Sequence, residues 1–200
     1  MKFLIIPAAI LIAVIIIIVV IAKSSAFPNI TIESGSERAG RRGETAATNA
    51  IRSILREDDR LFTNVEISFE DKPAELDNVI VNSFGVFVIE VKNYSGTLVG
   101  NEDDYEWVKY KTTDAGNTYE KTVKNPIKQV KRQVHILAKY LEYYGSSVWI
   151  EGYALLIQGN SPVRSTYILS SIDDIDRAIH TPGRNRLSKQ RIDAIVKLIQ

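Results

Sequence analysis

The chain has 200 residues, 45% of them hydrophobic, and its 25 basic and 24 acidic residues give a formal net charge of +1. This length suits one medium-sized domain with an appendage, and the balanced charge excludes a generally basic nucleic-acid-binding module, so any such affinity must come from local patches. Cysteine is absent and His135 and His180 are the only histidines, which excludes disulfides and thiolate- or histidine-rich metal sites and leaves carboxylates as the ligands for any metal.

An unbroken, isoleucine-rich apolar run extends from Phe3 to Ala22. It reaches the roughly 20 residues that a helix needs to span a bilayer and exceeds the apolar region of roughly 7–15 residues in a signal peptide. The sequence therefore predicts a membrane anchor over residues 1–23, with a cleaved signal peptide as the alternative because small residues follow at 24–26. Basic residues after the run outnumber those before it, which favours a cytoplasmic domain by the positive-inside rule.

Residues 24–42 carry Ser, Gly, Pro and charges without sustained periodicity and are predicted to form a tether. From Gly43 to about Glu57 apolar residues recur at helical spacing, which predicts the first helix of a domain over residues 43–200. Glu44 shares the stripe of this helix that faces the core. An acidic residue in a first helical turn commonly complements the helix dipole, and the pattern alone favours that structural role for Glu44.

A strand predicted over residues 61–69 leads into a β-hairpin. Its two arms, 75–81 and 86–92, are rich in Val and Ile, and the turn between them contains Asn82, Ser83 and Gly85. Apolar residues occupy both faces of each arm. The arms are therefore predicted to be central strands of a sheet, buried on both sides.

Three charged residues share one face at the open end of this hairpin. A turn centred between residues 83 and 84 places Asp77 directly opposite Glu90, and Lys92 lies beside Glu90 on the same face. Because opposed carboxylates repel each other, a positive group must lie between them. Lys92 is one candidate, and the other is a divalent cation held by oxygen ligands, as Mg²⁺ or Mn²⁺ prefers.

Short strand-like pieces between Gly96 and Lys124 alternate with Asn, Asp and Gly, which predicts a polar β-excursion. Its aromatic residues Trp107, Tyr105 and Tyr110 could stack on bases. A small hydrophobic cluster beneath a long loop is the commoner arrangement for such residues and is the one we expect.

Asn125 and Pro126 open a helix that is predicted to run to about Tyr144. Gln129 lies at the border of its apolar stripe, where it could reach the carboxylates. The opposite face suits a phosphate backbone and equally an ordinary solvated surface, because it carries four basic residues: Lys128, Arg132, His135 and Lys139. Strands over 148–157 and 166–169 and helices over 172–179 and 188–199 follow. The pattern predicts an α/β fold with a mixed central sheet flanked by helices.

Four motifs resemble, in order, those of the nuclease-related domain (NERD) family, a branch of the PD-(D/E)XK nuclease superfamily. They are Gly40-Arg41-Arg42-Gly43-Glu44, Glu75-Leu76-Asp77, Ile89-Glu90-Val91-Lys92-Asn93-Tyr94-Ser95-Gly96 and Asn125-Pro126-Ile127-Lys128-Gln129. The resemblance extends from about Gly40 to about Leu141 without a departure at these positions. It implies a restriction-endonuclease-like core, and it reverses the preference for a purely structural Glu44.

The resemblance also implies metal-dependent hydrolysis of DNA phosphodiester bonds, here by a domain that the apolar run is predicted to anchor in a membrane. Asp77, Glu90 and the main-chain carbonyl of Val91 would hold Mg²⁺ or Mn²⁺ with help from Glu44, Lys92 would hold the attacking water, and Gln129 would position these groups. The alternative is a tethered domain that binds nucleic acid or protein without cleaving it. A purely structural membrane protein is the weakest hypothesis, because it gives no reason for charges clustered at the end of buried strands.

Overall fold

The computed structural model describes residues 35–113, 115–183 and 186–200. Its helices are α2 (Gly35–Ile54), α3 (Pro126–Tyr143), α4 (Ile172–His180) and α5 (Lys189–Ile199). Its strands are β1 (Arg60–Phe69), β2 (Lys72–Asn82), β3 (Gly85–Lys92), β4 (Thr97–Val99), β5 (Glu106–Thr112), β6 (Thr118–Lys124), β7 (Ile150–Leu156) and β8 (Ile168–Leu169). The predicted anchor lies outside the described residues. None of the helices just named is long and apolar enough to cross a bilayer.

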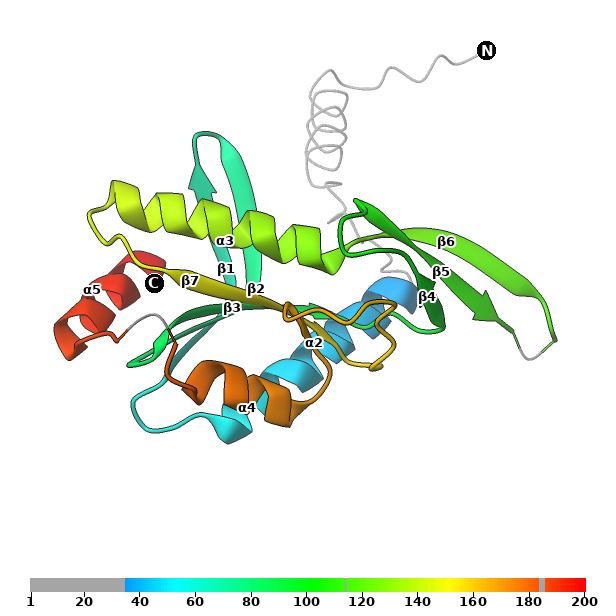
Figure 1. Cartoon of the computed structure of the whole chain (residues 1–200), viewed down its shortest axis with the longest axis horizontal. Helices are drawn as coiled ribbons and strands as arrows, with labels where there is room; N and C mark the ends of the chain where they lie inside the picture. Colours follow the sequence, from blue (N-terminus) through cyan, green and yellow to red (C-terminus); the bar gives the residue numbers. More distant parts are fainter. Residues whose placement is uncertain (1–34, 114, 184–185) are drawn as a thin grey trace, which may run out of the picture. The chain divides into compact units, whose positions relative to one another are not determined.

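A five-stranded sheet in the order β1-β2-β3-β7-β8 forms the centre of the domain (Figure 1). Strands β1, β2 and β3 pair antiparallel, whereas β7 pairs parallel with both β3 and β8. Figure 1 shows α3 on one face of this sheet and α2 and α4 on the other. The prediction of a mixed α/β fold with a central sheet flanked by helices is therefore confirmed.

Strand β3 is buried on both faces, which explains its nearly continuous run of apolar residues. Val86 and Val88 pack in a cluster with residues of α3 and α5, such as Leu137 and Ile195. Phe87 and Ile89 point to the other face, where they pack in a second cluster with residues of α2 and α4. The hairpin strands are central, as their composition predicted.

Helix α2 begins earlier than the sequence pattern indicated. It starts at Gly35 instead of Gly43, so the last part of the predicted tether is helical, and it ends at Ile54. Asn93, just after β3, contacts this part of α2, since its Nδ2 donates to the carbonyl of Ala39 at 3.0 Å. A Cβ on Gly43 would lie only 2.8 Å from the Cβ of Asn93. The segment after β3 thus packs against α2 at residues 39 and 43, a contact between distant segments that helical periodicity could not reveal.

Strands β4, β5 and β6 form a separate antiparallel sheet, which is the predicted β-excursion. Trp107 is fully buried and packs with Leu98, Ile127 and Leu156. The predicted hydrophobic cluster is therefore confirmed for Trp107, and this residue is not free to stack on bases. Tyr105, by contrast, is 85% exposed.

Candidate active site

Strands β2 and β3 separate at the position of the predicted acidic residues. Their regular pairing extends from Asn82 with Gly85 to Asn78 with Ile89, which is the register expected from the turn. Beyond this point the main-chain N–H of Val91 donates to Oδ2 of Asp77 at 2.7 Å. In a strand the N–H and C=O of one residue point to the same neighbour, so the Val91 carbonyl also points to the side of Asp77. We call this end of the β2–β3 pair the fork.

Glu90 is almost completely buried at the fork, with 1% of its surface exposed. Nζ of Lys92 and Nε2 of Gln129 both contact its Oε1. Nε2 of Gln133 donates to the other carboxylate oxygen, Oε2, at 2.5 Å. A buried carboxylate is costly unless it is paired and hydrogen-bonded, and these three donors satisfy that requirement. The structure thus brings Glu90, Lys92 and Gln129 together from β3 and α3.

The negative charge at the fork exceeds what Lys92 compensates. Burial and the neighbouring Glu90 raise the pKa of Asp77 to about 7, against the opposing effects of the Val91 N–H bond and Lys92. Glu44 raises the pKa of Asp77 further by its negative charge. A bound cation would remove this imbalance, since metal ions are often the largest local charges in such sites.

Glu44 lies on α2, on the other side of the sheet from α3; it is partly buried and near enough to Asp77 for its charge to affect the pKa of that residue. One turn later, Thr48 donates through Oγ1 to Oδ1 of Asn78 at 2.9 Å, which ties α2 to β2 beside Asp77. The pairing of β1 with β2 skips Asn64 and Asp77, and Asn64 adopts a positive φ of 52°. Asn is among the few residues other than glycine that tolerate this conformation. The backbone is therefore irregular on both sides of Asp77.

Sequence reasoning missed Gln133. Its side chain is buried, and its Nε2 contacts both Glu90 and the carbonyl of Glu75, the latter at 2.8 Å. Its Oε1 is buried without a hydrogen-bond partner among the described residues. Gln133 follows Gln129 by four residues, so the two side chains share one helix face. That spacing was the available signal, because a helix face that places Gln129 at the carboxylates places Gln133 there too.

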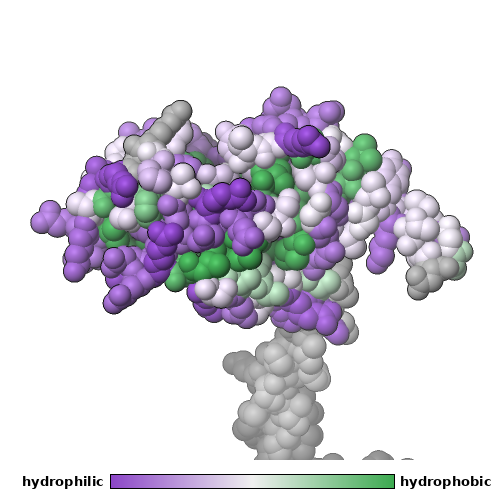
Figure 2. Space-filling view, turned by 60° about the horizontal axis from the view of Figure 1, so that its bottom comes forward, coloured by the Kyte–Doolittle hydropathy of each residue, from purple (hydrophilic) through white to green (hydrophobic). Residues whose placement is uncertain are grey.

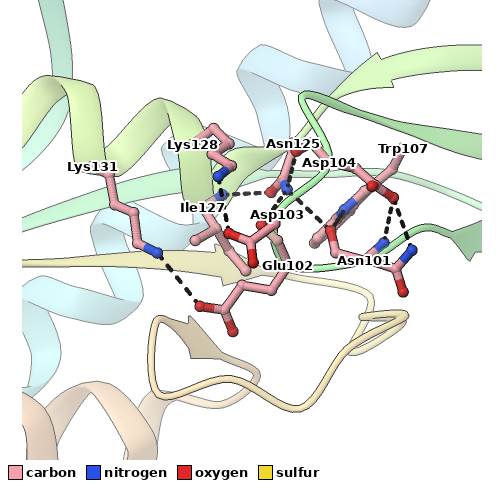
Figure 3. Close-up of polar contacts among 9 residues, drawn as sticks. All are labelled: Asn101, Glu102, Asp103, Asp104, Trp107, Asn125, Ile127, Lys128 and Lys131. Atoms are coloured by element: carbon pink, nitrogen blue, oxygen red, sulfur yellow. Dashed lines mark hydrogen bonds and ion pairs between the residues drawn. The ribbon is translucent and has the colours of Figure 1, made fainter.

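Asn125 lies at the start of α3, the helix that carries both glutamines, and Figure 3 shows its contacts with the preceding loop. Its Oδ1 accepts from the N–H of Ile127 at 2.9 Å and so caps the helix. Its Nδ2 donates to three carbonyls of the loop between β4 and β5, those of Asn101, Glu102 and Asp104. One side chain thereby joins this loop to the first turn of α3.

The predicted basic stripe of α3 is largely paired within the chain. Lys128 forms an ion pair with Asp103 at 3.1 Å, as Figure 3 shows, and Lys139 pairs with Glu142 at 2.8 Å. Arg132 donates to the carbonyl of Pro73 at 2.9 Å. His135 is exposed. Of the two interpretations left open, these contacts favour a solvated helix face.

The fork supplies a small set of oxygen donors. Within residues 35–113, 115–183 and 186–200, no group of three or more His, Cys, Asp or Glu side chains is placed to hold a metal ion. The donors at the fork are the carboxylates of Asp77 and Glu90 and the main-chain carbonyl of Val91. Mg²⁺ is commonly bound through one or two carboxylates and keeps several waters, so this set fits Mg²⁺ or the similar Mn²⁺.

A comparison with known protein families gives a match. Residues 39–157 match the family described as the nuclease-related domain, NERD, over more than half of the chain. Neither the curated proteins nor the solved structures contain a match. The matched segment includes the five side chains predicted for the site: Glu44, Asp77, Glu90, Lys92 and Gln129. The chain therefore belongs to the nuclease-related domain family.

Proposed function

We propose that this protein is a metal-dependent nuclease that hydrolyses phosphodiester bonds of DNA at the fork. The observation that supports this most directly is the raised pKa of Asp77 beside the buried Glu90. Strongly perturbed acidic groups are concentrated at functional sites, and here the perturbation comes from burial and a second carboxylate. Membership of the nuclease-related domain family points to the same chemistry.

In this proposal Asp77, Glu90 and the Val91 carbonyl hold Mg²⁺ or Mn²⁺, with Glu44 assisting from α2. When bound, such an ion supplies Lewis acidity to a phosphoryl oxygen and lowers the pKa of the attacking water. Lys92 holds that water and stabilises the negative charge that develops on the phosphoryl group, as a fixed cation does best in a partly dry pocket.

Gln129 and Gln133 act as positioning residues. Both donate to Glu90, one to each carboxylate oxygen, and so fix the orientation of the carboxylate. Groups that hydrogen-bond a metal-binding side chain commonly tune both its geometry and its affinity. Asn125 supports this arrangement, because it fixes the first turn of the helix from which both glutamines project.

The test is cleavage of linear, nicked, branched and single-stranded DNA by the full-length chain in nonionic detergent, with Mg²⁺ or Mn²⁺. Asp77→Ala should abolish turnover. Lys92→Ala should slow it by about 10²–10³-fold while leaving metal binding largely intact, the scale for losing one preformed stabilising group. Lys139→Ala is the matched control, because this lysine pairs with Glu142 away from the fork. Equal cleavage by the wild-type protein and the three variants would exclude the fork as the active site.

The second candidate function is binding of nucleic acid or protein without cleavage. Two observations favour it: the described residues contain no three-ligand metal cluster, and Lys92 is engaged by Glu90. Under this hypothesis the chain binds DNA or a protein partner, cuts none of the substrates above, and shows no heat of Mg²⁺ or Mn²⁺ binding in a calorimetric titration.

We further propose that residues 3–22 anchor the chain in a membrane with the domain on the cytoplasmic side. The support is the length of the apolar run and the excess of basic residues after it. Full-length protein should remain in the membrane fraction after an alkaline wash, and protease should reach the domain only from the cytoplasmic side. A soluble species that begins near Ala26 would show a cleaved signal peptide instead.

A further inference from the structure

Three lysines gather on one face of the hairpin formed by β5 and β6. Lys109 is paired with Lys121 across the strands, and Lys111 lies two residues from Lys109 on the same face. Tyr119, which is paired with Lys111, is 59% exposed beside them. We call this surface the lysine face. Directly opposed like charges destabilise a strand pair, so the stability of the sheet gives no reason for this cluster.

The opposite face of the same hairpin has a different charge pattern. There Glu106 is paired with Lys124 and Tyr110 with Glu120, so acidic and basic residues are mixed. Along the described parts of β5 and β6, the lysine face carries no acidic residue. Three of the four lysines of the two strands therefore lie on one face, apart from the acidic residues.

The charges of the lysine face are not neutralised within the described parts of the chain. None of its three lysines forms a hydrogen bond or an ion pair with a described residue. Burial, together with Lys121 and Lys111, lowers the pKa of Lys109 below its ordinary value. Lys128 and Lys131 differ in this respect, because each is paired with an acidic residue of the neighbouring loop (Figure 3).

The hairpin begins and ends beside the fork. Lys92 is the last residue of β3 and precedes β4, while Lys124 is the last residue of β6 and precedes the helix that carries Gln129. Tyr94 links the two ends, since its hydroxyl donates to the carbonyl of Lys124 at 3.2 Å. Figure 2 shows the hairpin projecting from the body of the domain, with a surface that is mostly white to purple. A ligand long enough to leave the fork could thus follow this projection.

We propose that the lysine face binds the phosphate backbone of a nucleic acid strand that extends from the fork. The inference rests on the proposed function, which supplies a polyanionic substrate at the base of the hairpin. Lys109 and Lys111 are separated by about 7 Å along a strand, and duplex DNA carries one negative charge about every 1.7 Å of its axis, so the cluster can face several phosphates. Such contacts provide affinity and orientation without reading sequence, and Tyr119 offers an aromatic surface for a base or sugar.

The test measures binding separately from cleavage. Fluorescence anisotropy follows the full-length chain in nonionic detergent with EDTA, titrated against labelled single-stranded and duplex DNA at several salt concentrations. The variant Lys109→Gln/Lys111→Gln/Lys121→Gln removes the lysine face. The control variant Lys72→Gln/Lys139→Gln/Lys197→Gln removes the same net charge from other surfaces. Circular dichroism confirms that both variants are folded.

Loss of the lysine face should weaken DNA binding by about tenfold or more at moderate salt and reduce the slope of log Kd against log salt by about 2–3, or nearly one per phosphate contact. The control should change Kd by less than about twofold, since distant exposed charges are largely screened. Equal effects of the two variants, or none from the first, would overturn the proposal.

Other results separate this inference from the proposed function. DNA binding that depends on the lysine face, together with no cleavage in Mg²⁺ or Mn²⁺, would support the inference and refute the nuclease. Cleavage by the wild-type chain, together with unchanged DNA binding in the Lys109→Gln/Lys111→Gln/Lys121→Gln variant, would support the nuclease and refute the inference. The wild-type chain could instead bind neither single-stranded nor duplex DNA and cosediment with phosphatidylserine vesicles more than the triple-lysine variant does. The lysine face would then recognise a lipid surface, and the proposal would fail.

Discussion

Replacing Asp77 by Asn should stabilise the metal-free protein at alkaline pH. The raised pKa means that folding disfavours the ionised form of Asp77. The amide introduced by Asp77→Asn would be neutral and would still offer an oxygen to the N–H of Val91. A shift from 3.8 to about 7 corresponds to an upper limit of about 4 kcal/mol, at about 1.4 kcal/mol per unit. Because Glu90 shares in this repulsion, we expect a gain of about 2–4 kcal/mol in the free energy of unfolding.

The pH dependence of this gain has a definite sign. The folded state binds the Asp77 proton more tightly than the unfolded state does, so the contribution of Asp77 to stability is fully present below pH 3.8 and is lost as pH rises to about 7. The advantage of Asp77→Asn should therefore be largest at pH 8 and fall by more than half at pH 5. Urea unfolding in EDTA, followed by the fluorescence of the buried Trp107, measures the difference in free energy of unfolding between the variant and the wild type at each pH. Equal or lower stability of the variant at pH 8 would refute the electrostatic reasoning.

Three further predictions concern the groups around the fork. Gln133→Leu removes the donor to Oε2 of Glu90 and to Glu75, and urea unfolding should show a loss of about 1–3 kcal/mol, the scale for stranding a buried polar group. Asn125→Ala removes a helix cap and three bonds to the β4–β5 loop; we expect a loss of at least about 2 kcal/mol and faster proteolysis of that loop. Mg²⁺ at a hundredfold excess over its Kd should add about 2.7 kcal/mol to the stability of wild type, and Asp77→Asn should abolish this gain.

Local patterns in the sequence were sufficient for much of the fold. The turn at Asn82–Gly85 and the alternation around it determined the hairpin register, and with it the proximity of Asp77 and Glu90. Asn125 and Pro126 marked the start of α3 because a cap and a first-turn proline act within a few residues of each other. Short polar turns separated β4, β5 and β6 in the same local way.

The remaining features depend on contacts between distant segments. Helix α2 contacts Asn93 at Gly43 and Ala39, and no helical period records those contacts. The positive φ of Asn64 and the end of the β2–β3 pairing at Asn78 and Ile89 likewise leave no mark in the alternation of apolar residues along the strands. The spacing from Gln129 placed Gln133 on the same helix face, but the glutamine itself does not reveal that its partners are Glu90 and the carbonyl of Glu75.

The fork contains two kinds of polar group, side chains and main-chain atoms, and only the side chains can be removed by substitution. In a continuous sheet the main-chain groups of each strand are taken by its neighbours and are closed to ligands. Where β2 leaves β3, the N–H of Val91 and the carbonyl of Glu75 meet side chains instead. Substitutions can remove Lys92 or Glu44, but they cannot remove main-chain groups. A relative that lacks these two side chains would therefore keep the polar main-chain groups of the fork, and with them atoms that can hydrogen-bond a ligand whether or not it is cleaved.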